Sequence, residues 1–241
     1  MKDIDKVCSQ LIDWLKEKVL EANGKGLVFG LSGGIDSSLV AALAKKAFPE
    51  NSLGIIMPCY SNPEDEKDAL LVAKTLNLKT KKVDLSDTYD VFLKSTEVST
   101  YDQLAKANVK PRLRMTTLYY FAQLNNYLVA GGTNKSEFEV GYFTKHADSG
   151  SDILPIASFV KEEVQEMASF LGVPKKIIYK TPSAGLWEEQ TDEEEMGFSY
   201  KVLDNYIRTG NASKNVKERI DKMNKNSEHK RKFPPVYNYK K

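Results

Sequence analysis

The sequence has few of the residues that build disulfide frameworks, zinc sites or membrane spans. Its 241 residues include only two cysteines, Cys8 and Cys59, and only two histidines. Neither cysteine belongs to a Cys-x-x-Cys pair or a Cys/His cluster, so the pattern gives no support to a disulfide scaffold or a zinc site. No apolar run approaches the length of a membrane span, and the N-terminus lacks the apolar core of a signal peptide. We therefore expect a cytoplasmic protein that binds no membrane.

The chain also lacks an excess of charge of either sign. Its 35 Lys and Arg residues and 33 Asp and Glu residues leave a net charge of +2, which gives no global field to attract nucleic acid. The segment 214–241 is locally basic, with ten Lys or Arg against three acids, and a solvated terminus explains it without a nucleic-acid partner. With 41% hydrophobic residues, this length predicts a single domain over 1–241.

A glycine-rich segment over 29–38, Phe-Gly-Leu-Ser-Gly-Gly-Ile-Asp-Ser-Ser, separates a short apolar run from a helical pattern. Gly33 and Gly34 permit positive φ and close backbone approach, so successive amides at the helix N-terminus can face phosphate oxygens. Asp36 is suited to hold Mg²⁺ on those oxygens. The segment lacks the Lys of kinase-type loops and the G-x-G-x-x-G spacing of Rossmann dinucleotide sites. It predicts a pyrophosphate cradle.

The rest of the pattern alternates apolar strands with amphipathic helices. Strands are predicted over 26–29, 52–57, 79–85 and 127–130, and helices over 4–19, 62–76, 102–124 and 158–171. Pro111 predicts a break within 102–124. Strands joined by helices of this length favour a doubly wound, Rossmann-like, mostly parallel α/β sheet flanked by helices. Gly131 and Gly132 directly follow the fourth strand, at the carboxyl edge where such sheets bind ligands.

The Ser-Gly-Gly-x-Asp-Ser pattern at 32–37 resembles the loop of the ATP pyrophosphatases, which split ATP into AMP and pyrophosphate. Further segments resemble, in order and over nearly the whole chain, the motifs of the ammonia-dependent NAD synthetases. They are Asn108-x-x-x-Arg112-x-Arg114-Met115, 133–137, 141–145 with Asp148 and Asp152, 182–187 with 190–193, and 228–231. The resemblance implies a carbon–nitrogen ligase that amidates deamido-NAD⁺ to NAD⁺ with ATP and ammonia, the final step of NAD biosynthesis. Its nicotinate would be adenylated first, with release of pyrophosphate and then AMP.

The resemblance also assigns residues to the site. The ATP-binding positions are Gly30, Leu31, Ser32, Gly33, Gly34, Ile35, Asp36, Ser37, Gly132, Lys161 and Ser183. The deamido-NAD⁺ positions are Arg112, Lys145, Asp152, His229 and Lys230, and the Mg²⁺ ligands are Asp36 and Glu137. Asp36, Lys161 and Ser183 are the expected catalytic groups. Gly132 stands where many relatives carry Thr, so a hydroxyl role there would need adjacent Thr133.

Four further expectations concern the reaction and the assembly. The attacking ammonium must lose a proton, and Asp148 or Asp152 is our hypothesis for the group that takes it. The segments 84–110 and 186–196 are hypothesised to close over ligands. By resemblance the protein is a homodimer, and because no glutaminase domain is recognised in the chain, free ammonia is the expected nitrogen source.

The same motifs are also compatible with three other functions. Another ATP pyrophosphatase, such as a tRNA thiolase or the synthetase part of GMP synthetase, shares the 32–37 loop. Thiolases commonly use cysteines near the site, and GMP synthetase needs a dimerisation domain and a glutaminase. A non-catalytic nucleotide sensor on the same scaffold is a third alternative, disfavoured because both predicted metal carboxylates are retained.

Overall fold

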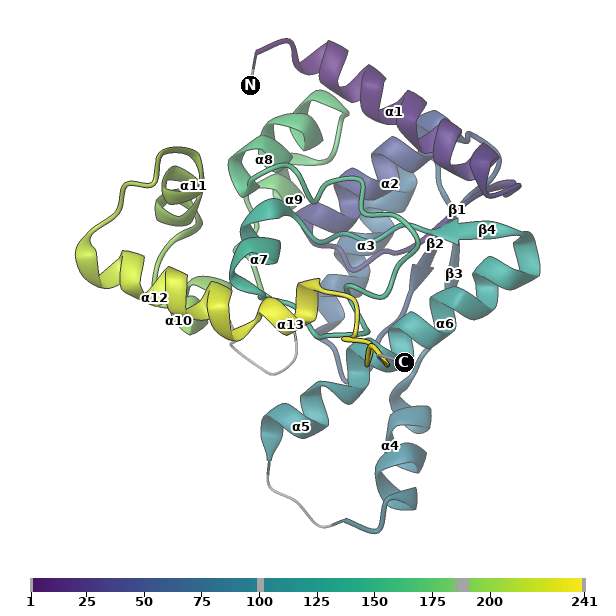
Figure 1. Ribbon diagram of the computed structural model, residues 1–241. Coiled ribbons are helices and arrows are strands. Elements are labelled where there is room, and N and C mark those ends of the chain that lie inside the picture. The colour runs from purple at the N-terminus through teal and green to yellow at the C-terminus, as the bar shows by residue number, and fades with distance from the viewer. Residues whose placement is uncertain (1, 99–101, 184, 186–190, 240–241) are drawn as a thin grey trace.

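Four strands form one parallel sheet at the centre of the protein. The computed structural model describes residues 2–98, 102–183, 185 and 191–239 (Figure 1). The strands are β1 (Gly26–Gly30), β2 (Ser52–Ile56), β3 (Lys79–Lys82) and β4 (Tyr127–Val129). Their order is β3-β2-β1-β4, with every neighbouring pair parallel. The chain winds outward from β1 to β3 and then crosses to the other side of β1, so the predicted doubly wound fold is confirmed and its switch point lies between β1 and β4.

Helices cover both faces of this sheet. One face is covered by α1 (Ile4–Glu21), α2 (Ile35–Ala47), α3 (Pro63–Thr75), α8 (Lys161–Phe170) and α9 (Lys175–Ile178). The other face is covered by α4 (Ser86–Ser95) and α6 (Val109–Asn125), with α5 (Gln103–Ala107) leading into α6. Successive strand side chains alternate between the faces: Leu27 and Phe29 enter the first core and Val28 the second. No helix among the described residues is long and apolar enough to cross a membrane.

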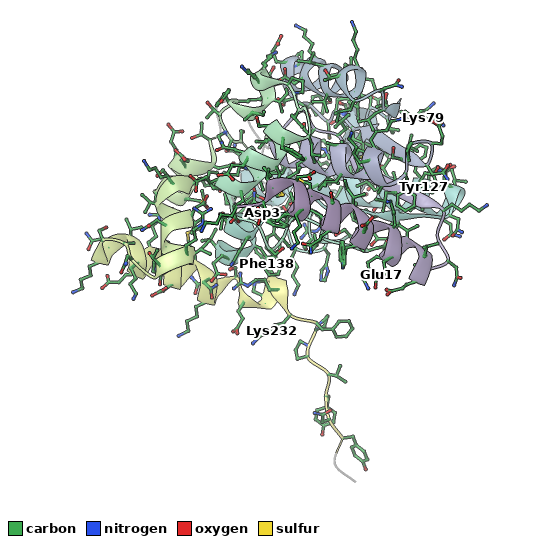
Figure 2. All side chains as sticks on the ribbon, turned by 90° about the horizontal axis from the view of Figure 1, so that it is seen from above. Asp3, Glu17, Lys79, Tyr127, Phe138 and Lys232 are labelled. Carbon is green, nitrogen blue, oxygen red and sulfur yellow. The ribbon has the colours of Figure 1, made fainter. Side chains whose placement is uncertain are left out.

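A smaller helical cluster packs beside the sheet. It contains α7 (Lys135–Val140), α10 (Asp192–Met196), α11 (Tyr200–Thr209), α12 (Lys214–Asn226) and α13 (Glu228–Arg231). Its core is built around Val140, Met196, Leu203 and Ile220, each at most 2% exposed. After α13 the chain leaves the body as an extended tail (Figure 2).

Local signals place most element ends where the sequence predicts them. The Asn62 side chain accepts a hydrogen bond from the Glu64 amide at 2.9 Å and caps α3. The helical segment before Pro111 is interrupted at Asn108, as expected from a Pro that cannot donate in a helix interior. The predicted start of α8 at Ser158 is wrong. The helix begins at Lys161 because the Glu163 carboxylate accepts the Val160 amide at 3.0 Å.

Candidate active site

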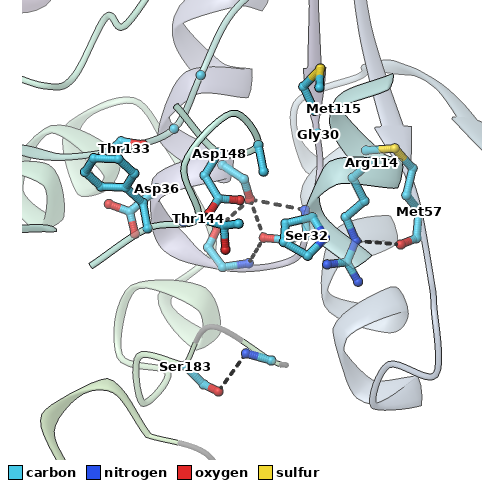
Figure 3. Close-up of a pocket in the computed structure, with 18 of the residues that line it drawn as sticks. Gly30, Ser32, Asp36, Met57, Arg114, Met115, Thr133, Thr144, Asp148 and Ser183 are labelled. Atoms are coloured by element: carbon cyan, nitrogen blue, oxygen red, sulfur yellow. Dashed lines mark hydrogen bonds between the residues drawn. The ribbon is translucent and has the colours of Figure 1, made fainter. Parts of the chain in front are cut away.

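A large cavity opens at the carboxyl ends of β1, β2 and β4, beside the switch point of the sheet. Its volume is about 1000 Å³, and its walls come from the loops after these strands and from α6, α7, α8 and α13. Figure 3 shows Ser32, Asp36, Arg114 and Asp148 around part of this space. Ligands of open α/β sheets bind at this edge, so the geometry supports the predicted position of the nucleotide site.

The loop after β1 is held open by its own hydroxyl groups. The Ser32 and Ser37 Oγ atoms are 3.0 Å apart, Ser37 Oγ donates to the Gly34 carbonyl at 3.0 Å, and the Gly34 amide donates to Ser32 Oγ at 3.2 Å. Gly33 has φ of 80°, and a Cβ there would lie 2.5 Å from the Asp65 carbonyl oxygen. Gly34 has φ of −86°, so of the two glycines that could adopt a positive φ only Gly33 does so. The loop therefore presents a preformed α2 N-terminus to the cavity.

A buried lysine lies between the two predicted metal carboxylates. Lys161 Nζ is 2.6 Å from Asp36 Oδ2 and 3.2 Å from Glu137 Oε1, and Lys161 is only 4% exposed. Burial alone would lower the pKa of Lys161, but the adjacent Asp36 and Glu137 charges raise it above its ordinary value. Burial, reinforced by the Asp36 charge, raises the pKa of Glu137. Asn134 fixes the other Asp36 oxygen, since its Nδ2 donates to Oδ1 at 2.8 Å.

Side chains from α7, α10 and α11 hold this charged centre in place. Ser136 Oγ accepts the Lys161 amide at 3.1 Å and donates to Asp204 at 2.6 Å, which fixes the start of α8. The Tyr200 hydroxyl donates to Asp192 Oδ2 at 2.9 Å and lies 3.4 Å from Glu137. Lys161 Nζ lies over the Tyr200 ring, 4.7 Å from the ring centroid. The ammonium is thus enclosed by two carboxylates and an aromatic face.

The opposite part of the cavity gathers the predicted acceptor residues Arg112, Lys145, His229 and Lys230. The Arg112 guanidinium donates to the Asn108 carbonyl at 3.1 Å and to the Lys145 carbonyl at 3.2 Å. Lys230 Nζ donates to the Gly141 and Phe143 carbonyls, both at 2.8 Å, which docks α13 against the segment after α7. This side of the cavity is cationic, as an anionic acceptor requires.

Asp148 and Arg114 line the same cavity. Asp148 is open to the cavity and accepts the Thr144 amide at 2.8 Å. Its enclosure in the cavity raises its pKa, while the Thr144 amide and the Arg114 charge oppose the rise. Arg114 donates to the Met57 carbonyl at 3.1 Å (Figure 3), so it ties α6 to the end of β2.

Two predicted site residues are not part of the cavity wall. Gly33 packs against α3, as its close approach to Asp65 shows. Asp152 is engaged elsewhere: its carboxylate accepts the Val129 amide at 2.7 Å and the Tyr119 hydroxyl at 3.1 Å. The remaining predicted positions line the cavity, including the loop from Gly30, Gly132 and Ser183. Trp187 and parts of the hypothesised closing segments, 99–101 and 186–190, lie outside the described residues.

The absence of a side chain at Gly132 is not forced by crowding. A Cβ there would lie 3.7 Å from the nearest atom, the Ser37 amide nitrogen, which is ordinary contact. Adjacent Thr133 is 3% exposed and lines the cavity. Ser183 Oγ accepts the Gly185 amide at 3.1 Å, which shapes the turn after Pro182.

Sequence reasoning did not single out Asn134, Asp192 or Tyr200 as working parts of the site. Asn134 and Asp192 fall within the quoted motifs, so their motif positions were the available signal. Tyr200 stands eight residues after Asp192 in an ordinary amphipathic helix and gives no signal of its own. No group of three or more His, Cys, Asp or Glu in the described part of the chain is arranged to hold a metal by itself. Asp36 and Glu137 supply two carboxylates, so water or nucleotide oxygens would have to complete the coordination of a cation there.

Known proteins match this chain over most of its length. The family model described as NAD synthase matches residues 7–234. The NH(3)-dependent NAD(+) synthetase of Carboxydothermus hydrogenoformans is 56% identical, with 94% of this chain and 95% of that protein covered. The enzyme of the same name from Finegoldia magna is 53% identical, with 97% and 96% covered.

Solved structures agree with the fold. The NMN synthetase of Francisella tularensis superposes with a TM-score of 0.95 at 38% identity, covering 99% of this chain and all of that one. The NH3-dependent NAD synthetase of Campylobacter jejuni, in complex with a nitrate ion, superposes with a TM-score of 0.83 at 32% identity, covering 99% and 100%.

Proposed function

Since the chain belongs to the NAD synthase family, and its relatives are named NH(3)-dependent NAD(+) synthetases, we propose that it amidates deamido-NAD⁺ to NAD⁺ with ATP and ammonia. This carbon–nitrogen ligase reaction is the final step of NAD biosynthesis. The observation that carries the proposal is the buried Lys161 ammonium held between the half-buried carboxylates of Asp36 and Glu137 beside the glycine loop. A cation held by two carboxylates at a helix N-terminus is suited to a polyphosphate.

In the first step the nicotinate carboxylate oxygen attacks the α-phosphorus of ATP. A new phosphorus–oxygen bond forms, and the bond between the α-phosphorus and the bridging oxygen breaks, so pyrophosphate leaves with that electron pair. Two anions meet in this step, which favours cations and oriented amides over an acid–base pair. The amides of the 30–37 loop bind the phosphates, and Lys161 and Ser183 stabilise the leaving pyrophosphate.

Asp36 and Glu137 fit a Mg²⁺ site, since both are hard oxygen ligands and both already contact one cation, the Lys161 ammonium. When bound there, Mg²⁺ supplies neutralisation of the phosphate charge. Asn134 serves this site by holding Asp36 through a 2.8 Å hydrogen bond.

In the second step ammonia attacks the acyl carbon of the adenylate, and AMP leaves with the electrons of the carbon–oxygen bond. The attacking nitrogen loses a proton, and Asp148 is the better placed of the two hypothesised bases. It lines the cavity, whereas Asp152 is held by Val129 and Tyr119. Arg112, Lys145, His229 and Lys230 bind the anionic acceptor on the opposite side.

A second acceptor deserves an equal test, because the Francisella tularensis neighbour with a TM-score of 0.95 is an NMN synthetase. Nicotinate mononucleotide presents the same carboxylate and one phosphate, and lacks the adenylate half of deamido-NAD⁺. The same two chemical steps would convert it to the amide. Only the residues that contact the adenylate half would distinguish the two acceptors.

We further propose a cytoplasmic homodimer. The exposed residues Tyr120 and Leu124, each 62% exposed on α6, give this helix an apolar outer face that a second copy would cover. Sedimentation equilibrium measures the mass directly, and a monomer at working concentration would contradict the proposal.

Purified protein is assayed with ATP, Mg²⁺, ammonium and either acceptor, and AMP, pyrophosphate and amidated product are measured together. We expect the three products in equal amounts, with a higher kcat/KM for deamido-NAD⁺. A higher value for the mononucleotide would reassign the acceptor and leave the chemistry intact. Pyrophosphate release that ignores both acceptors would refute the proposal.

A further inference from the structure

The Lys161 ammonium occupies the place that a divalent cation needs. It lies 2.6 Å from Asp36 Oδ2 and 3.2 Å from Glu137 Oε1, whereas Mg²⁺ binds carboxylate oxygens at about 2.0–2.1 Å. A metal ion at that distance from the same two oxygens would lie beside the ammonium, and the two positive charges repel at such short range. When Asp36 and Glu137 hold a metal ion, the Lys161 side chain therefore has to move.

The Lys161 ammonium is poorly solvated where it lies. Lys161 is 4% exposed, and an unpaired buried charge costs several kcal/mol. A second carboxylate close to the first two would avoid that cost when the ammonium is displaced.

Asp192 is that carboxylate. It is also 4% exposed, and its Oδ1 atom is buried without a hydrogen-bond partner, although its Oδ2 accepts the Tyr200 hydroxyl at 2.9 Å. The Tyr142 hydroxyl, which donates to Glu195 at 2.7 Å, also faces Asp192. Lys161 Nζ already lies over the ring of Tyr200, 4.7 Å from its centroid. Lys161 and Asp192 thus contact the same tyrosine, and the Oδ1 atom of Asp192 has no donor among the described residues within hydrogen-bond distance, which is costly for a buried acceptor.

We propose that Asp192 is a positioning residue that receives the Lys161 ammonium when a divalent cation binds Asp36 and Glu137 in the absence of nucleotide. The inference rests on the proposed function for its two metal ligands. The exchange also reaches the segment that carries Ser183, because the Asp192 amide donates to the Pro182 carbonyl at 3.2 Å. Asp192 thereby links metal binding to the position of a group expected to contact the leaving pyrophosphate.

The test measures metal affinity alone, so it does not depend on any acceptor. Mn²⁺ is titrated into the protein without nucleotide, and free Mn²⁺ is followed by electron paramagnetic resonance in four proteins: the natural sequence, Lys161→Met, Asp192→Asn and the double variant. Lys161→Met removes the competing cation, so we expect Mn²⁺ to bind at least about tenfold more tightly despite the loss of turnover. Asp192→Asn weakens binding in the natural background, because the displaced ammonium then has no partner.

The double variant distinguishes an effect of Asp192 through Lys161 from direct coordination of the metal by Asp192. If Asp192 acts through Lys161, its substitution weakens Mn²⁺ binding about tenfold more in the natural background than beside Met at 161. An equal loss in both backgrounds would make Asp192 a direct metal ligand or a general electrostatic contributor and overturn the proposal. No gain in affinity for Lys161→Met would overturn it as well.

Matched variants guard against changes in folding. Lys161→Arg keeps the cation and should not tighten Mn²⁺ binding, and Lys180→Met removes a different cavity lysine and should leave the affinity within about twofold. Urea unfolding checks each variant, with Lys161→Gln as the replacement if the Met variant does not fold. Failure of NAD⁺ formation with these metal affinities as expected would refute the proposed function alone.

Discussion

Asn134 offers a test of how the structure holds its metal carboxylates. The side chain is fully buried and makes two bonds of different kind. Its Oδ1 accepts the Glu137 amide at 2.9 Å and caps α7, and its Nδ2 donates to Asp36 Oδ1 at 2.8 Å. Asn134→Ala removes both bonds, whereas Asn134→Ser keeps a capping oxygen and is too short to reach Asp36.

The two hydrogen bonds contribute different amounts to the free energy of unfolding. Loss of an N-cap costs roughly 1 kcal/mol, and loss of a hydrogen bond to a charged group costs roughly 1.5 to 3 kcal/mol. Because Asp36 is partly open to the cavity, we take the lower end, so Asn134→Ala should lower the free energy of unfolding by about 2.5 kcal/mol. For a chain of this size that corresponds to a fall of about 5–10 °C in melting temperature. Asn134→Ser should lose about 1.5 kcal/mol, since only the bond to Asp36 is missing.

The assay is urea unfolding without metal or nucleotide, followed by circular dichroism, with turnover measured separately. Both variants release Asp36, so both should raise the Mg²⁺ concentration needed for half-maximal turnover by a similar factor. Equal stability loss in the Ala and Ser variants would show that the cap contributes nothing measurable. An unchanged Mg²⁺ requirement in both would refute the claim that Asn134 orients Asp36.

Three further predictions use other parts of the site. Gly33→Ala should lower the free energy of unfolding by at least about 2 kcal/mol, because the φ of 80° and the 2.5 Å approach to the Asp65 carbonyl both oppose a side chain. Gly34→Ala would meet only Ser32 Oγ at 3.4 Å, so its free energy of unfolding in urea should stay within about 0.5 kcal/mol of the parent value. Asp36→Ala and Glu137→Ala should each abolish NAD⁺ formation while circular dichroism stays native, and robust turnover in either would refute the metal assignment. The raised pKa of Asp148 means that the folded state binds its proton more tightly, so its contribution to stability declines as pH rises from about 4 through the folded pKa. Asp148→Asn should remove this decline in urea titrations from pH 4 to 8, and an unchanged rate and pH profile at saturating ammonia would exclude Asp148 as the base.

The sheet and the glycine loop are predictable from the sequence because the signals that indicate them are local. The apolar run before Gly30, the glycine pair and the capped helix at Asn62 each act over a few residues, and their physical causes are visible in the chain itself. The third strand is less well predicted, since β3 ends at Lys82 and its four residues are all exposed at the sheet edge. Its limits depend on pairing with β2, which is a long-range contact.

The charged centre shows where sequence reasoning stops. Motif resemblance places Asp36, Glu137 and Lys161 in one site, yet nothing in their spacing says that the ammonium lies between the carboxylates. That arrangement depends on tertiary contacts 125 and 24 residues apart along the chain. Asp152 illustrates the converse, because its motif position gives no sign that its carboxylate is engaged by the Val129 amide.

The short helix α7 explains how these distant groups come to act together. Its N-cap Asn134 holds Asp36, its third residue Glu137 holds Lys161, and Val140 at its end lies in the core of the smaller helical cluster. The Gly141 carbonyl at the C-cap accepts a hydrogen bond from Lys230, so the lysine of α13 is anchored to the end of the same short helix. Asn134, Glu137 and Gly141, within one stretch of eight residues, thus contact Asp36, Lys161 and Lys230. We therefore expect a displacement of Asp36 or Glu137 to alter the position of Lys230, because the contacts of all three run through α7 and the residues that flank it.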